Sequence, residues 1–163
     1  MLFRSMLNTG LQLWKARAAE QTLRPEWLQQ KRLWPQRMSQ AGYQTFLTGK
    51  WHVSVDAAKV FETVRHVRGG MPKDTPAGYG RPTGPEDHEW LPWDEARGGF
   101  WEGGRHWSEV VADDALDFLK AAQTDPRPFF IYAAFNAPHD PRQSPRQFVD
   151  LYPAAQVQVP ASF

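Results

Sequence analysis

The sequence predicts an α/β protein whose sheet is mostly parallel, and three segments carry that prediction. Residues 43–48 are rich in aromatic and β-branched side chains, which favours a strand. Residues 108–122 place apolar side chains at helical spacing, and residues 129–135 are almost entirely apolar, as in a strand buried on both faces. Strands that alternate with helices are typical of a parallel sheet.

The first half of the chain surrounds the first predicted strand. Pro35 is best tolerated in the first turn of a helix, so we expect a short helix over residues 35–41 that ends at Gly42. The strand over residues 43–48 follows directly. Residues 60–64 have the β-branched and apolar character of a second short strand.

A long segment without clear periodicity covers residues 68–105 and is dense in Gly, Pro and Trp. Loops of this length are usually functional or disordered, and the aromatic content argues against disorder. The tryptophans in and just after this segment either pack it onto the scaffold, which is the more common role, or form the walls of a substrate cleft: Trp90, Trp93, Trp101 and Trp107.

The helix over residues 108–122 has Ser108 as its expected N-cap. Three aspartates occupy the side opposite its apolar residues, and at these positions we expect a solvated face rather than a metal cluster: Asp113, Asp114 and Asp117.

Two further elements are predicted after the apolar strand. Ser144 and Pro145 have the character of an N-cap and first helical residue, which predicts a short helix that extends to about Leu151. Val157 and Val159 then begin one more predicted strand.

The composition is that of an ordinary globular protein of 163 residues, 41% apolar and 23% charged. With 19 basic and 18 acidic residues, the chain has no global field that would attract nucleic acid or a membrane surface. No segment reaches the roughly 20 apolar residues of a membrane span. The absence of cysteine excludes disulfides and thiolate metal sites within these residues. The first residues are too short and too soon polar for a secretory signal, and localisation stays open.

Polar side chains follow two of the predicted strands. Lys50 and His52 come directly after the first strand, and they would project to the same face if the strand geometry continued through them. His139 follows the apolar strand in a proline-flanked turn. In open α/β sheets the ligand crevice lies at the carboxyl ends of the strands, so we expect these side chains to converge there. A lysine and two histidines suit a small, multiply charged oxyanion.

The amino-acid sequences of these segments resemble the signature motifs of one family. Residues 41–52 resemble the second signature of the sulfatases, which runs Gly-Tyr, a Thr or Ser, three further residues, then Gly-Lys-Trp-His. Residues 129–141 resemble that family's strand and histidine-containing loop. The Gly-Met-Pro and Gly-Phe-Trp-Glu-Gly-Gly stretches between them are similar to bacterial choline-sulfatase-like and iduronate-sulfatase-like enzymes. The resemblance covers essentially the whole chain and implies a partial α/β/α sandwich of the alkaline-phosphatase type.

The start of the chain resembles the end of the first sulfatase signature, Cys-x-Pro-Ser-Arg-x-x-Leu-x-Thr-Gly. Arg4 falls on its arginine, and residues 7–10 supply its Leu-x-Thr-Gly. Leu2 and Phe3 match neither the proline nor the serine. The cysteine that becomes formylglycine would fall one residue before Met1. We therefore expect residues 1–163 to be part of a sulfatase N-terminal catalytic domain, and this piece by itself to be inactive.

The resemblance implies a hydrated formylglycine nucleophile and a calcium ion acting on a sulfate ester, carried by a small molecule or a sulfated glycan. Arg4 would steady the aldehyde hydrate or the sulfate, and Lys50 would bridge nucleophile and substrate oxygens. His52 would act as a base that assists opening of the sulfated hemiacetal, and His139 would donate to the sulfate. No position here matches the family's calcium ligands, so no metal-binding residue is predicted.

Two alternatives stay open from the sequence. One is a non-catalytic remnant that binds an anion or a sulfated sugar. The other is a phosphoester or phosphonate hydrolase of the same superfamily, because the sheet edge and the oxyanion chemistry are shared. A Thr or Ser in place of the missing cysteine would favour the phosphatase chemistry.

Overall fold

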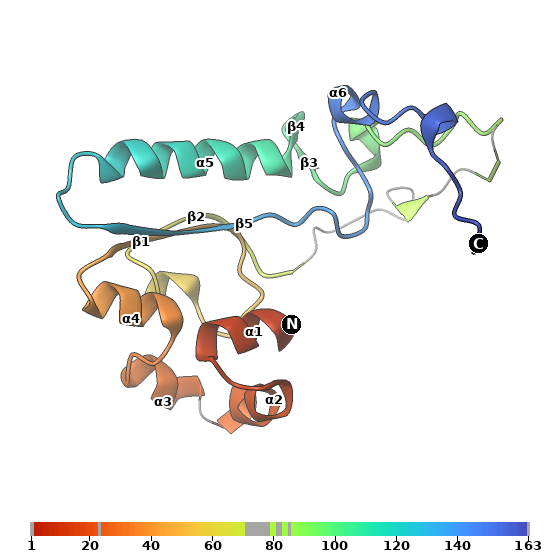
Figure 1. Ribbon diagram of the computed structural model, residues 1–163. Coiled ribbons are helices and arrows are strands. Elements are labelled where there is room, and N and C mark those ends of the chain that lie inside the picture. Colours follow the sequence, from red (N-terminus) through yellow and green to blue (C-terminus); the bar gives the residue numbers. More distant parts are fainter. Residues whose placement is uncertain (1, 23, 71–78, 81–82, 85, 163) are drawn as a thin grey trace. The chain divides into compact units, whose positions relative to one another are not determined.

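A parallel sheet of three strands organises the first part of the molecule (Figure 1). The strands are β1 (Gln44–Lys50), β2 (Thr63–Arg68) and β5 (Phe129–Ala134), in the order β2-β1-β5. The central strand, β1, pairs in parallel with both neighbours. The predicted α/β class with a mostly parallel sheet is confirmed.

The computed structural model describes residues 2–22, 24–70, 79–80, 83–84 and 86–162. The chain divides into two compact units. The first unit contains Met1–Met71 and Ser108–Asn136, and the second contains Pro72–Trp107 and Ala137–Phe163. None of the helices in the described part of the chain combines the length and apolar composition needed to cross a bilayer.

Helices cover both faces of the sheet in the first unit. One face carries α5 (Trp107–Ala122), and the other carries α1 (Leu2–Thr9) and α4 (Trp34–Gln40) (Figure 1). Two further helices, α2 (Leu13–Thr22) and α3 (Arg24–Gln29), lie between α1 and α4 in the chain. These three layers agree with the expected partial α/β/α sandwich.

The core has two parts, one on each side of β1, whose residues are all buried. On the α5 face, the ring of Phe46 stacks on Phe118 with ring centroids 4.8 Å apart. On the opposite face, Leu47 packs in a cluster with Trp51 and Phe61. Successive residues of a strand point to opposite faces, so one strand serves both layers.

Helix α4 and strand β1 lie where the sequence predicts them. Pro35 stands in the first turn of α4, and Gly42 has a φ of 89° just beyond the C-cap, Ala41. A positive φ at this point is what a glycine readily provides. Strand β1 extends two residues past the predicted end, so that Gly49 and Lys50 belong to the sheet.

The second strand is shifted from its predicted place. It covers Thr63–Arg68 rather than residues 60–64. Val60 and Phe61 instead continue the turn of the 3₁₀ helix η1 (Ala57–Lys59), because both of their backbone N–H groups donate to the Ala57 carbonyl. This turn buries both side chains in the core below the sheet.

Two details predicted for α5 differ in the structure: the N-cap, and the exposure of one of its three aspartates. The helix begins at Trp107, whose N–H donates to the Phe100 carbonyl at 2.7 Å, so Ser108 lies inside the first turn rather than capping it. The aspartates also differ from one another, because Asp114 is buried against the sheet whereas Asp113 and Asp117 are exposed. Asp114 lies one turn from Val111 and Phe118, on the buried face.

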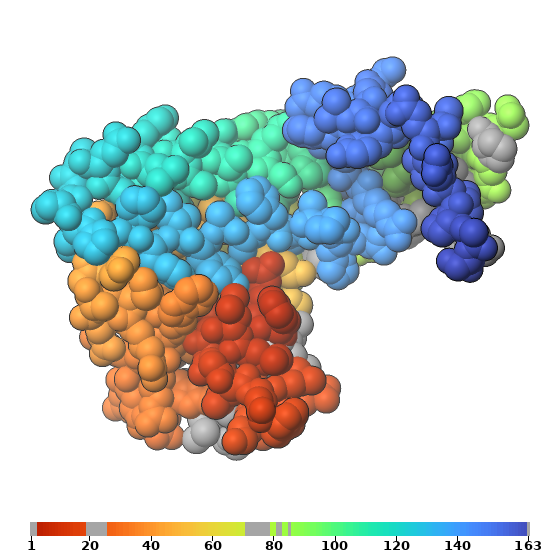
Figure 2. Space-filling view, viewed as in Figure 1, coloured from red at the N-terminus to blue at the C-terminus, as the bar shows by residue number. Residues whose placement is uncertain are grey.

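Strand β5 is not buried on both faces as its composition suggests. It pairs only with β1 among the described strands, and it therefore forms an edge. Phe129 is 48% exposed and Phe135, just beyond the strand, is 43% exposed. Figure 2 shows this segment open to view between α5 and the helices of the other face.

The second unit contains short elements joined by turns. They are a hairpin of β3 (Trp101–Glu102) and β4 (Arg105–His106), the helix α6 (Arg146–Val149), and the 3₁₀ helices η3 (Glu95–Arg97) and η4 (Ala154–Gln156). The N-cap of α6 is Pro145, not Ser144, whose N–H donates instead to the Pro92 carbonyl at 3.0 Å.

The last predicted strand is also wrong. Val157 follows η4 and is 67% exposed, and Val159 is 70% exposed, with no strand at either residue. Two valines in an alternating position were the whole signal, and none of the strands in the described part of the chain pairs with them.

Candidate active site

Gly49 sets the backbone path at the carboxyl end of β1. Its φ is +90°, a conformation that side chains disfavour. A Cβ at this position would also overlap the carbonyl oxygen of Ala134, at the end of β5. Only a glycine therefore lets β1 approach β5 this closely, one residue before Lys50.

A β-bulge interrupts the pairing of β1 with β2 at the same level. Thr48 pairs with Arg65 and Gly49 pairs with Val67, which leaves His66 as the extra residue of β2. His66 has a φ of 42°. Bulges bend a strand and re-aim the side chains beside them, and this one immediately precedes Lys50.

Lys50 is buried, with 7% of its surface exposed. Burial lowers the pKa of its ammonium group, and the positive charge of Arg4 lowers that pKa further. A lysine held beside an arginine in a partly dehydrated place gains stability when an anion binds between them. The electrostatics of this sheet edge therefore favour a negatively charged ligand.

Arg4 reaches the same edge from α1. Its Nη1 donates to the Lys50 carbonyl at 2.8 Å and to the Tyr132 hydroxyl at 3.4 Å, and its Nη2 donates to the Phe135 carbonyl at 3.4 Å. One guanidinium thus joins the ends of β1 and β5. The structure brings together Arg4 and Lys50, which lie 46 residues apart in the chain.

The turn that carries His52 is anchored by Trp51. The indole Nε1 donates to the Val55 carbonyl at 2.6 Å, and the Trp51 N–H donates to the Arg68 carbonyl at 2.8 Å. Strand geometry ends at Lys50, and His52 has a φ of 38°. The strand geometry therefore does not continue through His52, as it would have to for Lys50 and His52 to share a face. His52 still lies at this edge, two residues from Lys50.

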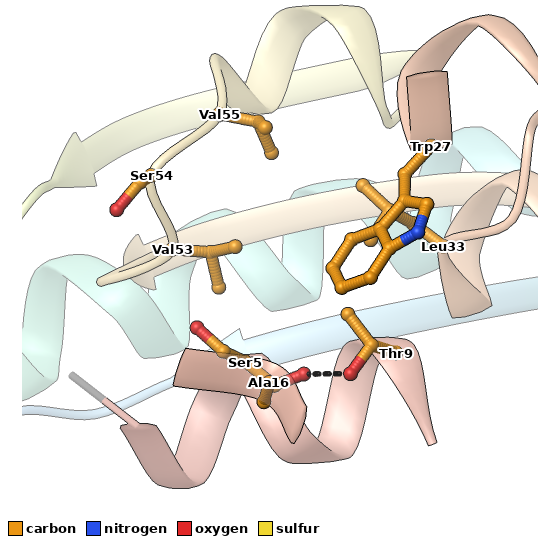
Figure 3. A pocket seen from close by; sticks show the side chains of 8 residues that line it. All are labelled: Ser5, Thr9, Ala16, Trp27, Leu33, Val53, Ser54 and Val55. Atoms are coloured by element: carbon orange, nitrogen blue, oxygen red, sulfur yellow. Dashed lines mark hydrogen bonds between the residues drawn. The ribbon is translucent and has the colours of Figure 1, made fainter. Parts of the chain in front are cut away.

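A small apolar pocket lies between the helix of Arg4 and the turn of His52 (Figure 3). Its volume is about 20 Å³, roughly the space for one water. It is lined by Ser5, Thr9, Ala16, Trp27, Leu33, Val53, Ser54 and Val55. Within α1, the Thr9 hydroxyl donates to the Ser5 carbonyl at 2.6 Å. The pocket is too small and too apolar to hold a sulfate.

His139 belongs to the second unit, whereas Arg4, Lys50 and His52 belong to the first. It is exposed, and its Nδ1 lies 3.0 Å from the carbonyl oxygen of Asp140. A contact with a carbonyl indicates that Nδ1 carries the proton in the neutral ring, which leaves Nε2 as an acceptor. The convergence of His139 with Lys50 stays a prediction.

Two residues at this edge were not predicted from the sequence. Tyr132 contributes its hydroxyl to Arg4 and packs its ring edge-on against Trp51, with centroids 6.0 Å apart. Asn136 is buried, and its amide nitrogen donates to the Gly70 carbonyl at 3.0 Å while its Oδ1 has no hydrogen-bond partner. The signal in both cases was a polar group in or beside an otherwise apolar strand.

The described residues contain no group of three or more histidine, aspartate or glutamate side chains that would hold a metal ion. Among the described residues, these side chains therefore form no cluster that would hold calcium. The three aspartates of α5 do not gather, because Asp114 turns to the sheet and Asp117 pairs with Arg65 at 3.1 Å.

Comparisons with known proteins agree on one family. The family model described as Sulfatase matches residues 4–161. N-acetylgalactosamine-6-sulfatase of Canis lupus familiaris is 30% identical over 134 residues, which cover 74% of this chain and 24% of that protein. The enzymes of the same name from Sus scrofa and Mus musculus are 30% and 28% identical, each over 72% of this chain. The chain spans about a quarter of the length of these relatives.

Proposed function

Because this chain belongs to the sulfatase family, we propose that the protein hydrolyses a sulfate ester at the carboxyl ends of β1 and β5. The contact of the Arg4 guanidinium with the Lys50 carbonyl, at 2.8 Å, is the observation that carries this proposal. It joins two separate family signatures into one cationic edge. Such an edge suits a group that carries several negative oxygens.

Arg4 and Lys50 bind and polarise the sulfate group. Arg4 is oriented by three acceptors, of which two are backbone carbonyls, so little reorganisation is needed when the ester arrives. The burial of Lys50 strengthens its attraction for an anion, because fewer waters screen its charge. Donors fixed in advance around developing negative charge contribute about 3–4 kcal/mol each to catalysis.

His52 and His139 handle protons and sulfate oxygens in this proposal. His52 serves as the base that releases the product sulfate, since it follows Lys50 closely and its turn is fixed by Trp51. His139 donates to a sulfate oxygen from the loop after β5. A donor role requires a proton on its Nε2, which means a protonated ring when Nδ1 stays bonded to the Asp140 carbonyl.

Formylglycine and calcium belong to the proposal through the family resemblance alone. The chain contains no cysteine, and its described residues form no metal cluster. A formylglycine nucleophile and calcium ligands would therefore come from outside these residues. When bound, calcium would add positive charge at the sulfate oxygens.

For the alcohol part of the ester we propose a sugar. The matched relatives are named for a sulfated amino sugar. The residues between the two signatures are similar to choline-sulfatase-like and iduronate-sulfatase-like enzymes. Choline sulfate and a sulfated iduronate are therefore the esters to compare. Rates on these esters and on N-acetylgalactosamine 6-sulfate would rank the three.

The proposal is tested with the protein expressed from its complete gene. We expect hydrolysis of an aryl sulfate that falls by roughly tenfold to a thousandfold in Lys50→Ala. Lys59→Ala, which removes an exposed lysine of η1, is the matched control and should retain the wild-type rate.

The other outcomes separate the alternatives. Turnover of a phosphate ester without turnover of any sulfate ester would replace the proposal with a phosphoester hydrolase. Tight binding of sulfate without turnover would leave an anion-binding protein.

A further inference from the structure

Asp114 of α5 contacts both strands of the bulge that precedes Lys50. Its Oδ2 accepts a hydrogen bond from the Thr48 hydroxyl of β1 at 2.7 Å. The same oxygen lies 2.8 Å from Nδ1 of His66, the extra residue of β2. An ionised carboxylate only accepts, so Nδ1 of His66 carries a proton in this pair.

This carboxylate is buried, with 5% of the residue exposed, and Thr48 is fully buried. A buried charge is costly unless it is paired and hydrogen-bonded. Asp114 therefore has a strong reason to keep both partners, and both partners belong to the bulge. Because the carboxylate binds one residue from each strand, it fixes the offset of β2 against β1.

The bulge itself needs such support. His66 adopts a φ of 42°, which a residue with a side chain reaches only at a cost. The hydrogen bond from its ring to Asp114 offsets part of that cost. Because of the bulge, the next two pairs of β1 and β2 are shifted by one residue, so that Gly49 pairs with Val67 and Lys50 pairs with Arg68.

We propose that Asp114 is a positioning residue that sets the place of Lys50 by holding the β-bulge between β1 and β2. Asp114 does not touch the substrate in this proposal. Its effect on catalysis rests on the proposed function, whereas its effect on the place of Lys50 does not.

The attachment of α5 does not depend on Asp114 alone. Phe118 stacks on Phe46, and the Arg65 guanidinium lies 5.3 Å from the centre of the Phe118 ring while it pairs with Asp117. These contacts keep the helix on the sheet when the Asp114 charge is removed, so the position of Lys50 can be tested in a folded protein.

The first experiment measures the pKa of Lys50 by NMR in Asp114→Asn. Loss of a nearby negative charge alone would lower that pKa further. Release of Lys50 from its buried place beside Arg4 would raise it toward the ordinary value, which is the result we expect. Asp113→Asn removes a charge from the exposed neighbouring position and should leave the pKa of Lys50 almost unchanged.

A second pair of variants tests the bulge while the imidazole is absent from both. Glycine accepts a positive φ, so His66→Gly should keep the bulge and the pKa of Lys50. Valine is β-branched and disfavours that φ, so His66→Val should raise the pKa of Lys50. The proposal would be overturned if the Lys50 pKa were the same in His66→Gly, in His66→Val and in Asp114→Asn.

Kinetics connect the bulge to the proposed function. With the complete protein and an aryl sulfate, Asp114→Asn should lower kcat by about tenfold to a hundredfold, because small displacements of a catalytic group are costly. An absence of sulfatase activity in the wild-type protein would remove the proposed function but leave the Lys50 titration valid. Normal kcat in Asp114→Asn with a displaced Lys50 would remove only the catalytic consequence.

Discussion

The segments that carry His52 and His139, the two histidines of the proposed site, are held in very different ways. His52 follows a central strand whose end is fixed by the sheet, by Arg4 and by the anchored ring of Trp51. His139 stands on an exposed loop of the second unit, and its ring contacts the carbonyl of the next residue. A side chain at the end of a central strand is placed by its neighbours, whereas a loop side chain is placed by its own turn.

The largest expected effect comes from changing the end of β1 itself. Gly49→Ala forces a Cβ against the Ala134 carbonyl at a φ that disfavours side chains. We expect a loss of about 2–4 kcal/mol in the free energy of unfolding, measured by urea denaturation, together with loss of activity. Gly69→Ala is the control, since a Cβ there meets nothing within 4 Å. Equal stability of the two variants would contradict the close approach of β1 and β5.

Lys50→Met should separate stability from function. Because burial and Arg4 lower the pKa of Lys50 in the folded state, its protonated form destabilises the fold at neutral pH. The wild-type protein should therefore gain stability as the pH rises from the lowered pKa toward the ordinary value of 10.5.

Methionine keeps most of the lysine stem without the charge. We expect Lys50→Met to be more stable than wild type at pH 7, with a smaller difference at pH 10. Its turnover of a sulfate ester should fall by roughly tenfold to a thousandfold, as in Lys50→Ala. Unfolding by urea at both pH values measures the difference in stability. A variant less stable than wild type at pH 7 would show that the lysine charge is stabilised rather than strained.

His139→Ala tests the other side of the comparison. An exposed loop residue contributes little to stability, so the unfolding midpoint should stay within error while kcat/KM for the sulfate ester falls about tenfold or more. His88→Ala is the control, because His88 is another exposed histidine of the second unit. Wild-type kinetics in His139→Ala would remove His139 from the proposed site.

The smallest effect is expected at Trp51. Trp51→Phe keeps an aromatic ring but removes the donor to the Val55 carbonyl, at a cost of about 1 kcal/mol in the free energy of unfolding. The exposed Trp14 provides the control, since Trp14→Phe should change stability by less than about 0.5 kcal/mol. A cost no larger than that of the control would mean that the turn of His52 is held in another way.

Features that depend on local sequence were predictable here. Pro35 marks the start of a helix and Gly42 marks its end, and the apolar and β-branched residues of β1 and β5 form strands. The resemblance assigned Arg4 and Lys50 roles at the same site, and the Arg4 guanidinium donates a hydrogen bond to the Lys50 carbonyl. Their roles stay predictions.

Features that depend on which elements are neighbours were not predictable. Asp114 looked solvated because the helical pattern placed it opposite the apolar residues, and its partners, Thr48 of β1 and His66 of β2, come from the sheet. Val60 and Phe61 favour a strand by composition, yet they continue a 3₁₀ turn in which both side chains are buried. Phe129 looked buried because its strand is apolar, although the strand forms a sheet edge.

The central claim is that the edge formed by Arg4 and Lys50 binds the sulfate group. Its most direct test is a titration of the complete protein with inorganic sulfate, followed by the NMR signals of the Lys50 ammonium and the Arg4 guanidinium. We predict saturable shifts of both signals and a rise in the pKa of Lys50, with no such change at the exposed Lys59. Shifts that never saturate, or that are equal at Lys50 and Lys59, would contradict the claim.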